Sequence, residues 1–242
     1  MSRITLLGAA VIATLALGLP LAAPAQPPAK PPADALTDPA MKAPEVIAFI
    51  GIKPGYRVAD IIAGRFVRAE SQAVGPKGKV YALMPAEVIK LHPEVGAPLK
   101  ALTADPAYAN VEVSTPPINS PALPSGLDAV FTRQNYHDLH DKFMGPADVP
   151  AFNKAVYAAL KPGGVYVVLD HAAPPGSGLA STDTTHRIDE ATVKSEVLAA
   201  GFRLDGESKI LANPADDHTK LVFDPSIRGK TDQFLLRFRK PR

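Results

Sequence analysis

The 242-residue sequence contains no cysteine. This absence excludes disulfide bonds, metal centres with thiolate ligands, and lipid attachment to a cysteine. Neither positive nor negative charge is in large excess, because the formal net charge at pH 7 is only +2. A nearly neutral chain gives no electrostatic reason to expect a nucleic acid or an anionic membrane as partner. Hydrophobic residues make up 46% of the chain, which is enough for the core of one sizeable domain.

The N-terminus has the pattern of a cleavable signal peptide. Arg3 supplies its positive charge, residues 4–21 form an apolar run, and residues 23–25 (Ala-Pro-Ala) fit a cleavage site before Gln26. The run is short for a membrane span and Pro20 interrupts it, which favours cleavage over anchoring. We therefore expect residues 1–25 to be removed and the protein to be exported, to the periplasm in a bacterium, without further membrane contact.

Proline and alanine then dominate residues 26–37, which predicts an extended linker. The folded domain is expected to span residues 38–242. Its first helix is predicted to begin with Asp38 as the N-cap and Pro39 at the first helical position, and to end at Gly51.

Strand and helix patterns alternate along this domain. Apolar and β-branched segments predict strands at residues 56–62, 79–83, 111–113, 127–132, 165–169, 202–210 and 234–238. Amphipathic segments predict helices at residues 68–74, 85–90, 149–160 and 189–200. Because the central strands are apolar throughout, the expected sheet is mostly parallel and covered on both faces. The expected fold class is therefore α/β: a Rossmann-like, doubly wound, seven-stranded sheet with a C-terminal antiparallel hairpin.

Several segments resemble, at their expected places, the class I S-adenosylmethionine (SAM)-dependent methyltransferases. The matching segments are residues 53–60 at the start of the first motif, 74–82 before the second strand, 160–168 with the LKPGG turn, and 190–202 with the AGF turn. Residues 131–140 and 186–190 are similar to a group of exported bacterial proteins described as predicted methyltransferases. The resemblance covers about residues 38–239.

This resemblance implies SAM as the cofactor and the transfer of its methyl group to a small-molecule acceptor. The cofactor-binding residues that it implies are Asp60, Ile62, Gly64, Met84, Asn135 and Tyr136.

The chain departs from the family pattern at two places. After Asp60 the family usually has several glycines, whereas this loop has only Gly64, followed by Arg65 and Phe66. Glycines allow the backbone to approach the ligand, so a bulky side chain above Gly64 would block the usual pose of the nucleoside. An acidic residue is also missing directly after the second strand, since Glu87 follows too late. An exported binding protein that keeps the fold without catalysis therefore remains an alternative.

Histidines and aspartates are expected to gather at one edge of the sheet. Residues 135–141 follow the fourth strand, Asp170 and His171 follow the fifth, and a long polar loop leads to His186. The candidate catalytic residues are His137, Asp138 and His171, with His137 or Asp138 as a general base for the acceptor.

Two other interpretations of this edge stay open. In one, the protein is a metal-dependent enzyme whose ion is bound by His137, His140 and His171 and completed by Asp170 or Asp138, because a helical i, i+3 spacing would place the first two on one face. In the other, these side chains bind no metal and only tie the loops together.

Overall fold

The computed structural model describes residues 33–145 and 147–242. The predicted signal peptide and the linker up to residue 32 lie outside the described residues. Within the described part, no helix combines the length and the apolar character needed to cross a membrane.

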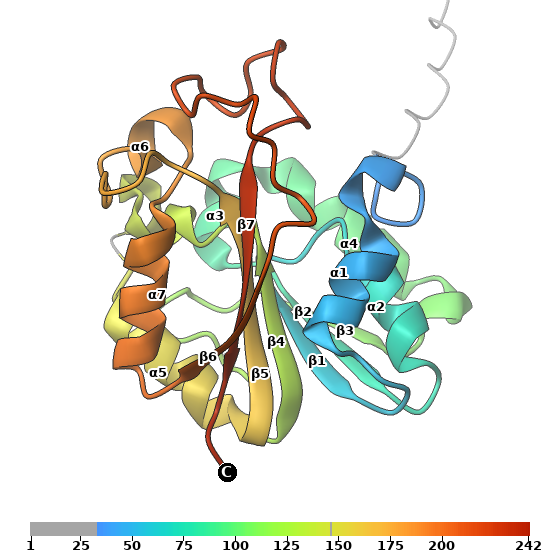
Figure 1. Ribbon diagram of the computed structural model, residues 1–242. Helices are drawn as coiled ribbons and strands as arrows, with labels where there is room; N and C mark the ends of the chain where they lie inside the picture. The colour runs from blue at the N-terminus through green and yellow to red at the C-terminus, as the bar shows by residue number, and fades with distance from the viewer. Residues whose placement is uncertain (1–32, 146) are drawn as a thin grey trace, which may run out of the picture. The chain divides into compact units, whose positions relative to one another are not determined.

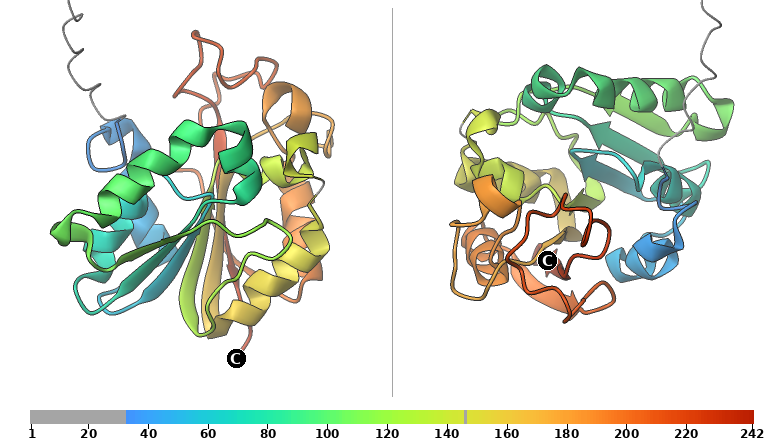
Figure 2. Two further views of the ribbon diagram at one scale, coloured as in Figure 1. Left: turned by 180° about the vertical axis from the view of Figure 1, so that it is seen from behind. Right: turned by 90° about the horizontal axis from the view of Figure 1, so that it is seen from above.

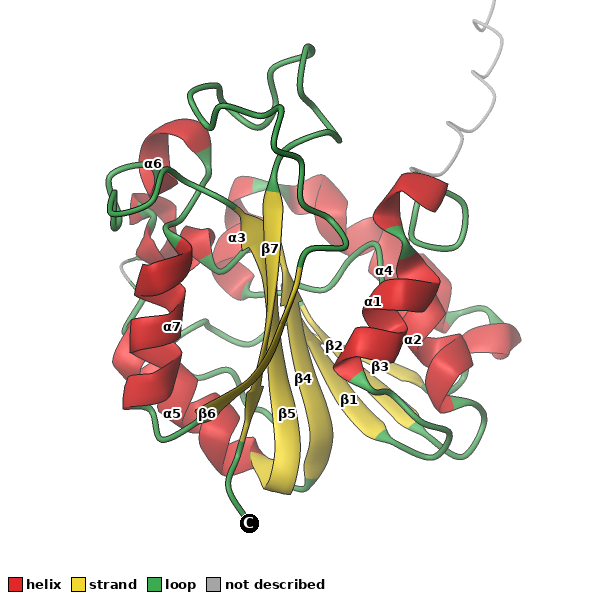
Figure 3. Ribbon diagram, in the orientation of Figure 1, coloured by secondary structure: helices red, strands yellow, loops and turns green. Residues whose placement is uncertain are grey.

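A seven-stranded sheet runs through the domain in the order β3-β2-β1-β4-β5-β7-β6 (Figures 1 and 3). Its strands are β1 (Arg57–Ile61), β2 (Lys79–Leu83), β3 (Val111–Ser114), β4 (Leu127–Arg133), β5 (Leu160–His171), β6 (Arg203–Ser208) and β7 (Gln233–Arg239). The first five strands are parallel, whereas β7 is antiparallel to both β5 and β6. The structure confirms the predicted fold class, including the C-terminal antiparallel hairpin.

Helices lie on both sides of this sheet (Figure 2). They are α1 (Ala43–Ile50), α2 (Val67–Val74), α3 (Ala86–Leu91), α4 (Gly96–Thr103), α5 (Val149–Ala159), α6 (Thr182–Thr185) and α7 (Glu190–Ala199). Short 3-10 helices occupy Pro39–Met41, Pro93–Val95, Pro106–Tyr108, His137–His140 and Lys142–Met144. The central strands β1, β4 and β5 are buried almost throughout, as their apolar composition predicts.

Prolines explain the two main differences from the predicted helices. The helix expected from Asp38 is divided at Lys42, which has a left-handed backbone (φ 47°), and Pro44 lies in the first turn of the new helix α1. In addition, α4 forms at residues 96–103, where the sequence pattern predicted no helix. Because Pro98 occupies the first turn of α4, its missing N–H leaves no helical hydrogen bond unmade.

Contacts with the domain begin four residues before the predicted start at residue 38. The carboxylate of Asp34 lies 2.8 Å from the guanidinium of Arg68 on α2. The next residue, Ala35, is buried and donates its N–H to the carbonyl of Arg65. These contacts attach the end of the linker to the loop that follows β1.

Candidate functional site

A cavity of about 730 Å³ lies at the carboxyl ends of β1, β4 and β5, at the top of the sheet in Figure 1. Its walls come from the β1–α2 loop, α3, the segment after β4, the end of β5, and the long loop of residues 209–232 between β6 and β7. Open α/β sheets bind their ligands at this edge, and the volume is typical of a small-molecule site.

The β1–α2 loop leaves open space beside Gly64. A Cβ atom built on Gly64 would meet no atom within 4 Å other than those of its chain neighbours Ala63 and Arg65. Phe66 is 1% exposed and packs edge-on against Phe131 of β4, with ring centroids 5.5 Å apart. Arg65 is exposed at the margin of the cavity. Phe66 is thus packed against β4 and does not contact the position of a Cβ on Gly64, whereas Arg65 is exposed and lines the cavity beside this glycine.

Asp60, the residue before the last of β1, is only 3% exposed. Burial raises the pKa of Asp60 to about 7, although a hydrogen bond from the N–H of Gly64 and the positive charge of Arg133 act in the opposite direction. Glu70 of α2 is fully buried nearby, and its carboxylate oxygens have no hydrogen-bond partner among the described residues. Burial and the charge of Asp60 raise the pKa of Glu70 as well. The carboxyl group of Asp60, which lines the cavity, is thus partly protonated near neutral pH.

Strained backbone is concentrated in the cavity wall. Three residues that line it, Ile62, Gln134 and His186, have left-handed backbone conformations with φ of 54°, 57° and 53°. This region is unfavourable for residues other than glycine, and especially so for a β-branched residue such as Ile62. Such strain persists only where the surrounding structure imposes it, and it tends to collect at functional sites.

The structure brings four of the six predicted cofactor residues to the cavity, namely Asp60, Ile62, Gly64 and Asn135. It does not bring the other two there. Met84 follows β2 but lines a separate cavity of about 590 Å³ beside α4 and β3. Tyr136 is fully buried, where its hydroxyl donates to Glu196 and accepts from the amide of Asn153. The Tyr136 hydroxyl therefore joins α5 to α7 instead of facing the cavity.

No carboxylate at the end of β2 replaces the acidic residue that the sequence lacks. The side chain of Glu87 accepts the backbone N–H of Ile118 at 3.1 and 3.2 Å, so it fixes the loop after β3. The wall of the cavity on this side is formed by α3 and the segment after it, mainly through the apolar side chains of Val88, Leu91 and Val95.

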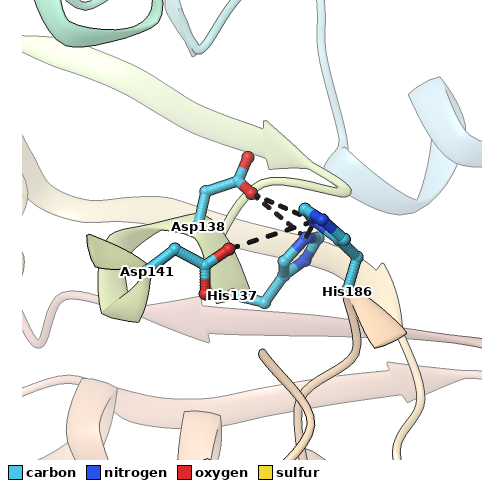
Figure 4. Close-up of side chains that lie close together, drawn as sticks. All are labelled: His137, Asp138, Asp141 and His186. Carbon is cyan, nitrogen blue, oxygen red and sulfur yellow. Dashed lines mark hydrogen bonds and ion pairs between the residues drawn. The ribbon is translucent and has the colours of Figure 1, made fainter. Parts of the chain in front are cut away.

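Four side chains from two segments converge in the opposite wall (Figure 4). We call His137, Asp138, Asp141 and His186 the His137 group. The Nε2 atom of His137 lies 3.2 Å from Oδ1 of Asp138 and 3.2 Å from Nδ1 of His186. Nδ1 of His186 in turn lies 3.8 Å from Oδ1 of Asp138 and 3.9 Å from Oδ2 of Asp141.

Asp170 at the end of β5 fixes the orientation of His137. One oxygen of its carboxylate accepts the backbone N–H of His137 at 2.9 Å, and the other lies 2.8 Å from Nδ1 of the ring. Burial alone would lower the pKa of His137, but the carboxylates of Asp170 and Asp138 outweigh it and raise this pKa well above its usual value. Burial would likewise raise the pKa of Asp138, and hydrogen bonds from His137 and His186 lower it instead.

The third candidate catalytic residue, His171, lines the same cavity but stays apart from this group. Its ring centroid is 6.2 Å from that of His137, and its Nδ1 is 2.7 Å from the hydroxyl of Thr231. Burial and the positive charge of His137 hold the pKa of His171 well below its usual value. At neutral pH, His171 is therefore the neutral imidazole of the site and His137 the cationic one.

The metal-ligand set considered from the sequence is not the one that the fold assembles. His140 points to α7, where its Nε2 lies 3.2 Å from the carboxylate of Glu196, and His171 is bound to Thr231. In their place, Asp141 and His186 lie beside His137. The sequence put both residues at the correct edge of the sheet. It gave no sign of their grouping, because the turn after α6 brings His186 back over a separation of 49 residues.

Comparisons with known proteins show a likeness in structure only. No protein-family model matches the sequence, and no curated protein matches it. A SAM-dependent methyltransferase from Aquifex aeolicus has a similar structure, with a TM-score of 0.57 and 22% identity over 85% of this chain and 95% of that one. Fibrillarin from Aeropyrum pernix, with natively bound SAM, has a TM-score of 0.50 and 17% identity over 80% and 73% of the two chains. The [4+2]-cyclase SpnF has a TM-score of 0.58 and 14% identity over 87% and 84%.

Proposed function

We propose that this chain, which has the fold of the SAM-dependent methyltransferases, binds SAM in the 730 Å³ cavity and transfers its methyl group to a small-molecule acceptor. The observation that carries this proposal is the continuity of the cavity. A single space joins the open backbone at Gly64 to the charged groups around His137, so donor and acceptor have room side by side. Holding two reactants together in this way supplies much of the catalysis in a displacement reaction.

The residues present provide groups to hold SAM near Gly64, but they provide no acidic residue for its ribose. The open backbone at Gly64, the carboxyl of Asp60 and the amide of Asn135 are the groups that would hold SAM. The wall along α3 offers apolar side chains, where the family usually has an acidic residue for the ribose. When bound, SAM supplies a methyl group on a positively charged sulfur.

At neutral pH the unprotonated groups of the cavity are the carboxylate of Asp138 and the ring of His171, and each is a weak base because its pKa is lowered. His137 is buried between two carboxylates and already carries its proton at neutral pH. It is therefore suited to orienting Asp138 and accepts a proton only above its raised pKa.

Binding of SAM is expected to depend on pH through Asp60. The positive charges of SAM favour an ionised carboxylate, and Asp60 becomes ionised as the pH rises through about 7. We expect the affinity for SAM to increase about tenfold from about pH 6 to about pH 8, as measured by calorimetry. The variant Asp60→Asn should lose this dependence, and Asp217→Asn on an exposed loop should keep it. An unchanged pH dependence in Asp60→Asn would contradict the assignment.

The raised pKa of Asp60 also makes the stability of the folded protein depend on pH. The pKa of Asp60 in the folded protein is raised above its usual 3.8, so the folded state binds this proton more tightly than the unfolded state does. Stability from this source is therefore fully present below about pH 4 and decreases as the pH rises to about 7. Glu70, whose pKa is also raised, changes stability in the same direction.

A binding protein without catalysis remains the second candidate. It is favoured by the lone Gly64 and by the use of Glu87 to fix a loop instead of a ribose. The fold does not decide between the two, because function depends on the site and one similar structure is described as a cyclase. A folded chain that binds neither SAM nor S-adenosylhomocysteine at millimolar ligand would support the binding protein.

We also propose that the protein is exported after cleavage before Gln26, a proposal supported by the apolar run and the Ala-Pro-Ala sequence at residues 23–25. An intact-mass measurement on the protein recovered from a bacterial periplasm should then give the mass of residues 26–242. A full-length mass in the membrane fraction would contradict cleavage.

A further inference from the structure

Four potential metal ligands in the cavity wall have ligand atoms that lie close together. One ligand atom from each of His137, Asp138, Asp141 and His186 lies within 4.8 Å of the other three. Four of the separations between these residues' ligand atoms range from 3.2 to 3.9 Å. Around a tetrahedral zinc ion, ligand atoms at normal bond lengths lie roughly 3.3 Å apart. The group is therefore close to the dimensions of a metal site before any ion is added.

The tautomer of His137 makes its close approach to Asp138 unfavourable unless a cation lies between the two side chains. Asp170 accepts a hydrogen bond from Nδ1 of His137, so the neutral ring has a lone pair on Nε2. That lone pair faces Oδ1 of Asp138 at 3.2 Å, a carboxylate oxygen that can only accept. A cation between the two atoms removes this repulsion, and in the metal-free chain a proton on Nε2 does so.

Surrounding contacts resemble the support that metal ligands normally receive. A carboxylate on the far nitrogen of a ligating histidine orients the ring and increases its basicity, as Asp170 does for His137. The second oxygen of Asp138 is held by the side-chain amide of Asn135 at 3.0 Å. Asp141 is 1% exposed, and its Oδ1 is buried without a hydrogen-bond partner among the described residues. A buried carboxylate oxygen of this kind lacks a cation to compensate for its burial.

We propose that His137, Asp138, Asp141 and His186 bind one divalent transition-metal ion, with zinc as the best-fitting representative. Two imidazole nitrogens and two carboxylate oxygens form a ligand set that zinc accepts in tetrahedral geometry. Imidazole ligands favour zinc and its neighbours over magnesium and calcium, which prefer oxygen alone.

The ion would face the cavity in which the acceptor is proposed to bind. All four residues line that cavity, and His186 is the most accessible of them, with 28% of its side chain exposed. An ion at this position can coordinate an oxygen atom of a bound ligand, which would make hydroxyl or carboxylate compounds the preferred class. None of the four ligands is among the residues proposed to hold SAM, and Asn135, which donates to Asp138, lies between the two groups in the same cavity.

Zinc binding can be tested on the mature chain after treatment with a chelator. Calorimetric titration with zinc chloride should show about one ion per chain with micromolar or tighter affinity, and elemental analysis after dialysis should give the same ratio. The variant His186→Ala removes a partly exposed ligand and should weaken zinc at least about tenfold. The control His140→Ala removes a histidine outside the group and should leave zinc affinity unchanged.

Cobalt(II) gives a second, spectroscopic measurement. Its visible absorption reports coordination by these four side chains and would not change if His186 only stabilised the fold. Cobalt(II) bound by this group should show visible absorption bands typical of four or five ligands, and these bands should disappear in His186→Ala. If this variant folds poorly by circular dichroism, Asp141→Asn takes its place. The absence of zinc binding would overturn the proposal, and so would equal zinc affinity in the wild type and both variants. Binding of S-adenosylhomocysteine to the metal-free chain tests the cofactor separately.

Discussion

The variant Gly64→Val is expected to weaken the binding of SAM about 10- to 100-fold while the protein stays folded. A Cβ atom at this position meets nothing in the free protein, and the backbone of Gly64 does not have a positive φ. Added methyl groups would instead occupy the space into which the cofactor must fit. Overpacking of this kind usually costs about 1–3 kcal/mol, which corresponds to the stated loss of affinity. Calorimetric titration of the variant with S-adenosylhomocysteine measures it.

The matched control is Gly206→Val in β6, at the edge of the sheet and outside the cavity. A Cβ atom at Gly206 makes only ordinary contacts, the nearest at 3.6 Å, and valine suits a strand. This control should bind S-adenosylhomocysteine as the wild type does. If Gly64→Val bound it equally well, the cofactor could not lie against this loop.

The variant Asp216→Ala is expected to lower the free energy of unfolding by about 3–5 kcal/mol, because it leaves a buried charge unpaired. Arg187 is 0% exposed, and its guanidinium lies 2.9 Å from a carboxylate oxygen of Asp216, whose side chain is 1% exposed. Arg187 also donates to the carbonyl groups of Ala172 and Lys220. These bonds attach the loop of residues 209–232 to the end of β5. Urea denaturation measures the loss.

The double variant Arg187→Met/Asp216→Leu shows how much of the lost stability comes from the unpaired charge of Arg187 and how much from the other hydrogen bonds of Asp216. Replacing a buried ion pair by apolar side chains of similar size is often neutral, so the double variant should be more stable than Asp216→Ala alone. Part of the loss should remain, because Asp216 also accepts the backbone N–H groups of His218 and Asp232. A loss below about 1 kcal/mol in Asp216→Ala would show that solvent reaches Arg187. Since this loop supplies Val222 and Phe223 to the cavity, ligand affinity should fall along with stability.

The fold was predictable because its signals are local. The apolar run around Asp60 and the helix cap at Asp189 each determine structure within a few residues. Residues 161–164, expected as a turn before the fifth strand, instead belong to β5. The strand at residues 79–83 was predicted with the bounds that the structure shows. Rules for parallel sheets then place the ends of β1, β4 and β5 at one edge.

The details of the site depend on long-range packing, which a single sequence does not show. Residue position alone suggested that Tyr136 faces a ligand, yet its hydroxyl is bound by Asn153 and Glu196. The direction of Phe66 is set by its contact with Phe131, 65 residues later. Likewise, His186, which has a left-handed backbone, contacts His137 across a separation of 49 residues. Each of these outcomes requires the three-dimensional fold.

The most direct test of the proposed function is a calorimetric titration of the mature chain with S-adenosylhomocysteine at about pH 8, with adenosine as the control ligand. A cofactor site at Gly64 and Asp60 predicts one bound molecule per chain, with micromolar affinity that Gly64→Val weakens. The absence of measurable heat at millimolar ligand, or binding that Gly64→Val leaves unchanged, would contradict it.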